Sequence, residues 1–166
     1  MVILYTWLPD PAAPLKGHAP DLGHSSLEIG DLYISFWPQK NSLTGIFTTL
    51  IKGRSTRQPQ SYEEEIKPEN GFMQRPADFT DGLPGVDEAA IIAGWQELQD
   101  ADFDATSYNC SHVNRDLLAS ALPPALGSRL PDLCEKREHL PLATCTPGGL
   151  RSAILELLSK QQNSEM

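Results

Sequence analysis

The hydrophobic pattern of this chain changes near Asp87, and that change limits the folds it can adopt. Before this position, short apolar runs are bounded by Gly, Pro, Asn and Asp, a pattern typical of strands and turns. After it, apolar residues recur with helical spacing. Strands early and helices late, without regular alternation of the two, predict an α+β domain rather than a doubly wound parallel sheet.

Short apolar runs in the first half predict strands. Residues 2–8 form one, because the following PDPAAP cannot continue a ladder without proline N–H groups. Residues 24–29 and 32–37 flank a Gly30-Asp31 pair and predict a β-hairpin. We expect another strand in SYEEEI, at 61–66, followed by turns and loops in the Pro- and Gly-rich residues 67–85. Residues 39–60 show no decisive pattern.

Three helices are expected in the second half. The first begins near Asp87, the second follows the motif SYNCSHV and ends at LPP, and the third lies in TPGGLRSAILELLSK. Thr146 is a natural N-cap for the third helix, with Pro147 at its first position. We therefore expect a single domain over residues 1–160, in which a small antiparallel sheet packs against about three helices, and a frayed tail over 161–166.

Charge and hydropathy exclude several classes of protein. The net charge of −9 and the scarcity of clustered Lys and Arg argue against a nucleic-acid partner. No stretch approaches the ~20 apolar residues of a membrane span. The start MVILYTWLP lacks a basic segment and predicts a first strand rather than a signal peptide. We expect a protein that is cytoplasmic, or exported without a cleavable signal peptide.

Three cysteines at scattered spacing do not form a disulfide framework. They favour the reduced state of a cytosolic-type protein, in which Cys134 and Cys145 are spare thiols. Cys110 differs, because it lies where the second helix begins. Unpaired backbone N–H groups and the positive end of the helix dipole stabilise a thiolate there. The residues alone leave three roles open for Cys110, namely nucleophile, metal ligand and buried small side chain.

A thiolate nucleophile needs an imidazole nearby. His112 projects about 200° away from Cys110 on a helix of about 3.6 residues per turn, so it is a poor partner. His139 lies in a charged, Pro-flanked loop. His24 follows Gly23, whose small size allows close approach, and the polar Ser25 and Ser26 suit a solvated cleft. We therefore predict the pair Cys110 and His24.

These motifs resemble the circularly permuted papain-like thiol hydrolases, which include the PPPDE peptidases and the lecithin:retinol acyltransferase-type enzymes, distant relatives of NlpC-type cell-wall hydrolases. The matching stretches are GHSSLEI at 23–29 and YNCSHV at 108–113. Histidine precedes cysteine, as permutation implies and in the reverse of the papain order. Acyltransferase-type relatives have a second imidazole where this chain has Ser35, Phe36 and Trp37. The resemblance thus favours a dyad, or a backbone carbonyl or Glu28 as the group that orients the ring.

The resemblance also implies a reaction and further site residues. Cys110 would attack a carbonyl carbon, His24 would act as general base, and an acyl-enzyme would follow. The backbone N–H of Cys110 would be part of an oxyanion hole. Tyr5 and Trp7 are candidates to line the cleft, although core aromatic residues fit the sequence equally well. Asn109 would hydrogen-bond the turn before the helix, and His112 would be structural.

The expected activity is that of a cysteine hydrolase of the peptidase or amidase type, without a cofactor. Its expected substrate is a peptide or protein, and a bacterial effector or toxin-like hydrolase fits the compact acidic chain. A lipid or thioester acyltransferase of the same fold is one alternative. A non-catalytic or zinc-binding interaction module is another, because Cys110, His112, Cys134, His139 and Cys145 supply sulfur and imidazole ligands. The consecutive Glu63, Glu64 and Glu65 are expected to be solvated rather than catalytic.

Overall fold

A computed structural model describes residues 1–12, 22–38, 58–104, 108–136 and 145–164. Its centre is a four-stranded antiparallel sheet in the order β3-β2-β1-β4. The strands are β1 (Val2–Trp7), β2 (His24–Ile29), β3 (Leu32–Ser35) and β4 (Phe79–Leu83). The hairpin formed by β2 and β3 turns at Gly30, which has a positive φ of 56°. The predicted first strand and hairpin are therefore confirmed.

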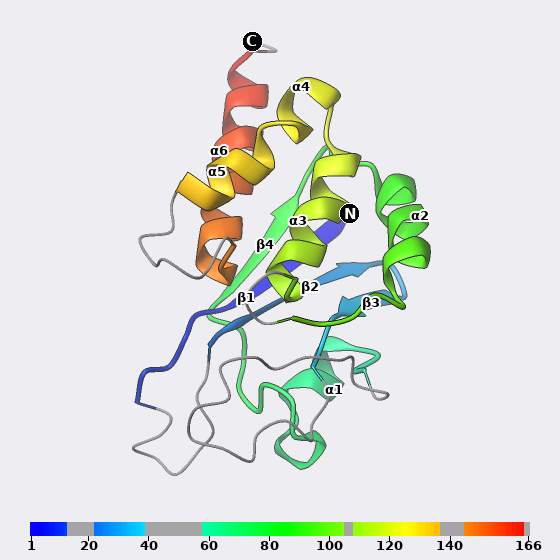
Figure 1. Ribbon diagram of the computed structural model, residues 1–166, viewed down its shortest axis with the longest axis vertical. Helices are drawn as coiled ribbons and strands as arrows, with labels where there is room; N and C mark the ends of the chain where they lie inside the picture. The colour runs from blue at the N-terminus through cyan, green and yellow to red at the C-terminus, as the bar shows by residue number, and fades with distance from the viewer. Residues whose placement is uncertain (13–21, 39–57, 105–107, 137–144, 165–166) are drawn as a thin grey trace.

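Helices cover one face of this sheet. They are α2 (Glu88–Leu98), α3 (Cys110–Ala121), α4 (Pro124–Gly127), α5 (Leu130–Lys136) and α6 (Pro147–Ser164). Figure 1 shows α3 and α6 against the sheet, with α2 beside α3 and α5 beside α6. Leu4 and Leu27 from the sheet are fully buried there with Val113 and Ile154. Burial of this apolar surface provides the main stabilisation of the fold.

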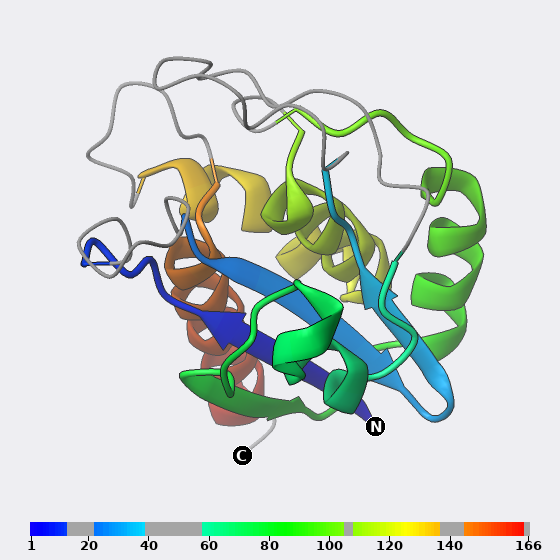
Figure 2. The same cartoon turned by 90° about the horizontal axis from the view of Figure 1, so that it is seen from below.

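The opposite face is covered by α1 (Tyr62–Ile66) and the 3-10 turn η3 (Pro68–Asn70), as Figure 2 shows from below. A smaller cluster of Tyr5, Trp7 and Tyr33 is buried on this face against Tyr62. Here the sequence predictions were wrong. Residues 61–66 form a capped helix instead of a strand, because Ser61 accepts a hydrogen bond from the backbone N–H of Glu64. Strand β4 lies within the predicted loop.

The three predicted helices correspond to α2, α3 and α6, with Asp87, Asn109 and Thr146 next to their starts. Asp87 and Thr146 accept hydrogen bonds from first-turn N–H groups, as N-caps do. The α+β class is confirmed. The described residues contain more helices than the three that were predicted, since α1, α4 and α5 were not anticipated. Helix α6 continues to Ser164, into the segment predicted to fray. None of the described helices is long and apolar enough to cross a membrane.

Candidate active site

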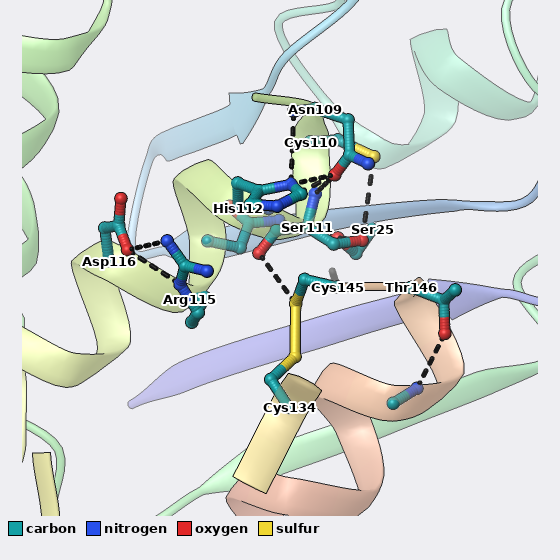
Figure 3. Close-up of a disulfide and its surroundings, with 12 residues drawn as sticks. Ser25, Asn109, Cys110, Ser111, His112, Arg115, Asp116, Cys134, Cys145 and Thr146 are labelled. Atoms are coloured by element: carbon teal, nitrogen blue, oxygen red, sulfur yellow. Dashed lines mark hydrogen bonds and ion pairs between the residues drawn. A yellow bond between two sulfur atoms is a disulfide. The ribbon is translucent and has the colours of Figure 1, made fainter. Parts of the chain in front are cut away.

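Cys110 is the first residue of α3, and Asn109 caps that helix. The Asn109 side chain accepts hydrogen bonds from the backbone N–H groups of Ser111 at 2.9 Å and His112 at 3.2 Å. In return, the backbone N–H of Asn109 donates to Nδ1 of His112 at 3.4 Å, which completes a capping box. His112 therefore turns back toward the cap (Figure 3), and its ring stabilises the helix that carries Cys110.

His24 begins β2 and is buried against two indole rings. Its ring stacks on Trp37, with centroids 4.5 Å apart, and lies 5.7 Å from the ring of Trp7. The preceding Gly23 has a φ of 78°, and a Cβ there would lie 2.6 Å from the carbonyl oxygen of Trp7. Only glycine fits this position, so the Gly-His pair is a requirement of close strand packing.

Cys110 and His24 are brought together although they come from a helix and a strand. Their side chains lie close enough for the charge on each to shift the pKa of the other. Burial opposes a charge on His24, but the negative charges of Cys110 and Glu65 outweigh it and raise the pKa of the ring to about 10. Burial likewise opposes a thiolate, yet His24 and the backbone N–H of Ser25 lower the pKa of Cys110. The directions of these two pKa shifts favour a thiolate–imidazolium pair.

A third charged residue, Glu65, completes the site. Its Oε1 atom lies 3.1 Å from Nε2 of His24, and the carboxylate is fully buried. Burial would raise the pKa of Glu65, but the charge of His24 and hydrogen bonds from His24, Ser35 and Tyr33 lower it. The carboxylate therefore stays ionised and fixes the orientation of the imidazole. This overturns the expectation of a solvated side chain for Glu65, whereas Glu63 is exposed as expected.

Strand β3 and the residues after it supply the donors that hold Glu65. Tyr33 and Ser35 donate from their hydroxyl groups, and the indole N–H of Trp37 donates at 2.7 Å. Tyr33 and Ser35 alternate along β3, so their side chains point to the same face of the sheet, and Trp37 follows two residues after Ser35. Ser35 also lies 2.9 Å from Nε2 of His24. The segment where the resemblance lacked a second imidazole thus binds a carboxylate instead.

Other predicted site residues have different surroundings. Glu28 was a candidate to orient His24, but its carboxylate accepts a hydrogen bond from the hydroxyl of Tyr5 at 2.9 Å. The carboxylate next to His24 is that of Glu65. Tyr5 and Trp7 are buried in the smaller aromatic cluster. The indole N–H of Trp7 donates to the carbonyl of Arg75 at 2.9 Å. Both aromatic side chains are therefore part of the buried packing on the α1 side of the sheet and do not line an open cleft. Ser25 and Ser26 are also fully buried, so the predicted solvated cleft around them is wrong.

The backbone N–H of Cys110 is the predicted oxyanion donor. Within the described residues it has no hydrogen-bond acceptor, whereas Asn109 accepts from the next two N–H groups. It lies at the positive end of α3, where a developing negative charge is stabilised. This placement is compatible with the predicted role.

Cys134 and Cys145 form a disulfide, so the expectation that they are spare thiols was wrong. The bridge links α5 to Cys145, two residues before the start of α6, with Cα atoms 5.5 Å apart. Cys145 Sγ also lies 3.7 Å from the carbonyl oxygen of Ser111, in the first turn of α3. Figure 3 shows the disulfide directly beneath that turn. Cys110 is the free thiol of the chain.

The same disulfide removes two cysteines from the set of potential ligands for zinc. Two of the five potential ligands are bonded to each other, and His139 lies outside the described residues. Among the residues that the structure describes, no group of three or more His, Cys, Asp or Glu side chains is arranged to hold a metal ion. Residues 39–57, where the sequence shows no decisive pattern, also lie outside the described residues.

Of the sequence predictions, the structure brings together Cys110, His24 and the capping Asn109, while Glu65 was missed. Two signals were available for Glu65. Ser61 and Glu64 have the spacing of a capping box, which indicates a helix start in SYEEEI. Tyr33, Ser35 and Trp37 place three donors on one face of a strand. Comparison with protein-family models, curated proteins and solved structures found no match.

Proposed function

We propose that this protein is a cysteine-dependent hydrolase of the peptidase or amidase type, in which Cys110 is the nucleophile, His24 the general base and acid, and Glu65 the residue that orients His24. The observation that carries the proposal is a buried imidazole, His24, that interacts with two acidic groups, the thiol of Cys110 and the carboxylate of Glu65. A structural cysteine has no need of that arrangement.

The reaction proceeds through an acyl-enzyme. The Cys110 thiolate attacks the substrate carbonyl carbon, and the backbone N–H of Cys110 stabilises the oxyanion that forms. The C–N bond then breaks, and the leaving amine takes the proton from His24. A water molecule gives a proton to the now neutral His24 and attacks the thioester. The C–S bond breaks, which releases the carboxylic acid and restores the thiolate and the imidazolium.

Glu65 has an electrostatic and an orienting part in this sequence. Because Nε2 of His24 faces Glu65 and Ser35, Nδ1 is the nitrogen that exchanges the proton with sulfur and the leaving group. The carboxylate keeps the imidazolium stable without taking its proton, as in other nucleophile, base and acid triads. The indole rings of Trp7 and Trp37 pack against the imidazole and restrict its movement.

The fold that we propose is the permuted papain-like one. It is supported by the order of histidine before cysteine, by the position of Cys110 at a helix start, and by the packing of α3 on the strand that begins with His24. With the carboxylate of Glu65 from α1, we propose a triad instead of the dyad that the resemblance favoured. The disulfide is typical of oxidising compartments, so it favours export over a cytoplasmic location.

Reaction with p-nitrophenyl acetate tests the proposed function, because this small ester acylates an activated thiol regardless of peptide specificity. We expect a burst of nitrophenol and an acetyl group on Cys110 in the intact mass and peptide map. Cys110→Ala should abolish the adduct, and His24→Ala should slow its formation. A primary amine is then added, and the product shows whether the acetyl group is transferred to water or to the amine. Transfer to water indicates a hydrolase, and transfer to the amine indicates an acyltransferase. Equal acetylation of wild type and His24→Ala would contradict the proposal.

A further inference from the structure

Three buried polar residues lie where β2 packs against α3, next to Cys110. Ser25 and Ser111 are fully buried, and Asn114 is 2 % exposed. The side chains of these three residues have no part in the reaction proposed above. A buried hydroxyl or amide is costly unless it is hydrogen-bonded, so their grouping beside the thiol calls for a physical reason.

The contacts among these residues form a line that ends on sulfur. Nδ2 of Asn114 donates to Oγ of Ser25 at 3.1 Å. Oγ of Ser25 lies 3.3 Å from Oγ of Ser111, which in turn lies 3.9 Å from Sγ of Cys110. Figure 3 shows Ser25 and Ser111 next to Cys110 at the start of α3.

The chemistry of the groups gives this line a direction. An amide nitrogen only donates, so Oγ of Ser25 accepts from Asn114. Each serine hydroxyl has a single proton. A thiolate sulfur can only accept, so a hydrogen bond to it uses the Ser111 proton, and the contact between Ser25 and Ser111 then needs the proton of Ser25. A thiolate accepts such a hydrogen bond strongly, because hydrogen bonds to charged groups are stronger than neutral ones.

We propose that Asn114, Ser25 and Ser111 form a directed hydrogen-bond chain that keeps the Ser111 hydroxyl as a donor to the Cys110 thiolate. These are positioning residues, since Asn114 and the Ser25 side chain act on sulfur only through Ser111. The chain also joins the strand that carries His24 to the helix that carries Cys110. The inference rests on the proposed role of Cys110 as a thiolate.

A substitution that reverses the direction of these hydrogen bonds tests the proposal. In Asn114→Asp, the carboxylate accepts the Ser25 proton, Ser25 accepts from Ser111, and the Ser111 proton turns away from sulfur. We expect the apparent pKa of Cys110, measured from the pH dependence of iodoacetamide alkylation, to rise by about one pH unit. In a Ser111→Ala background the same substitution should have a much smaller effect. An equal rise in both backgrounds would show a through-space effect of the new charge and would overturn the chain.

A second pair of variants covers the case in which Asn114→Asp does not fold. Ser25→Ala and Ser111→Ala should each raise the apparent pKa of Cys110, and the double variant should raise it no further than Ser111→Ala alone. Additive effects would overturn the chain. Thr6→Val is the matched control, because Thr6 pairs with Ser25 across the sheet and its buried hydroxyl has no partner among the described residues. It should leave alkylation unchanged.

Failure of this inference differs from failure of the proposed function. A wild-type Cys110 that alkylates with the pH dependence of an ordinary thiol would refute the thiolate itself, and the chain with it. A wild-type thiol that ionises at low pH while Ser25→Ala, Ser111→Ala and Asn114→Asp all match it would refute the chain and leave Cys110, His24 and Glu65 in place.

Discussion

The Oε1 atom of Glu65 lies 3.1 Å from Nε2 of His24, with both side chains almost fully buried. A buried carboxylate beside a buried imidazole stabilises the protonated ring, because each charge lacks the screening that water would provide. The proposed reactivity of Cys110 depends on that contact, because Glu65 helps to keep the His24 ring protonated beside the thiolate.

Glu65→Gln should weaken the site without removing its shape. The amide keeps the size of the side chain but loses the negative charge, so the imidazolium is less stable and the ring less well oriented. We expect acetylation of Cys110 by p-nitrophenyl acetate to slow by about 10²-fold at neutral pH. Glu63→Gln, on the exposed side of the same helix, is the matched control and should retain the wild-type rate. Equal rates for the two variants would remove Glu65 from the site.

The imidazole of His24 should stay protonated far above its usual pH range. Its pKa is raised to about 10 by the charges of Cys110 and Glu65, which outweigh the opposing effect of burial. NMR titration of the ring should therefore give a midpoint near pH 10 in the wild type. Cys110→Ala removes the thiolate charge, so the midpoint should move to lower pH. A wild-type midpoint at or below 6.5 would disagree with this interpretation.

His112 should make the fold sensitive to acid. Burial, together with Arg115, lowers the pKa of His112 to about 4, so the folded protein favours the neutral ring. The unfolded chain binds that proton near pH 6.5, and stability should fall by on the order of 2–3 kcal/mol as the pH drops from about 6.5 to 4.

His112→Gln isolates this contribution. Glutamine at this capping-box position still accepts the Asn109 N–H but cannot gain a charge. Thermal unfolding at a series of pH values should show a flatter acid dependence in His112→Gln than in the wild type. Parallel curves for the two proteins would assign the acid sensitivity to other groups, such as the carboxylate of Glu65.

The Cys134–Cys145 disulfide should stabilise the protein by about 3 kcal/mol, the range expected for a short closed loop. A reductant should therefore lower the melting temperature of the wild type. The double variant Cys134→Ala/Cys145→Ala should melt at that lower temperature with or without reductant. Because Cys145 touches the carbonyl of Ser111, we also expect slower acetylation of Cys110 in the double variant. A melting temperature of the wild type that is insensitive to reductant would contradict the bridge.

Local signals explain which parts of the fold could be predicted. The first strand and the hairpin follow from short apolar runs and the Gly30 turn, and α2, α3 and α6 from periodicity and capping residues. The pair Cys110 and His24 could also be predicted, because a helix start and a Gly-His strand start each have a visible chemical reason. Whether that pair is catalytic stays a prediction.

Longer-range contacts explain what was missed. Three adjacent glutamates resemble a solvated segment, and Glu65 is tolerated in the interior only because Tyr33, Ser35 and Trp37 donate to it from another element. Strand β4 contains Asp81 and Gly82, so its local preference is weak, and it forms by pairing with β1. The disulfide depends on the packing of α5 against α6, which the spacing of the cysteines does not reveal.

The ionisation of Cys110 in wild type and in His24→Ala tests the central claim most directly. Thiolate formation is followed by ultraviolet absorbance as the pH is raised, with Cys110→Ala subtracted as the blank. We predict that the wild-type thiol ionises well below the ordinary cysteine value of about 8.5, and that His24→Ala returns it to that value or above, because burial then acts without the imidazolium. Superimposable titrations near or above pH 8.5 in the two proteins would contradict the account.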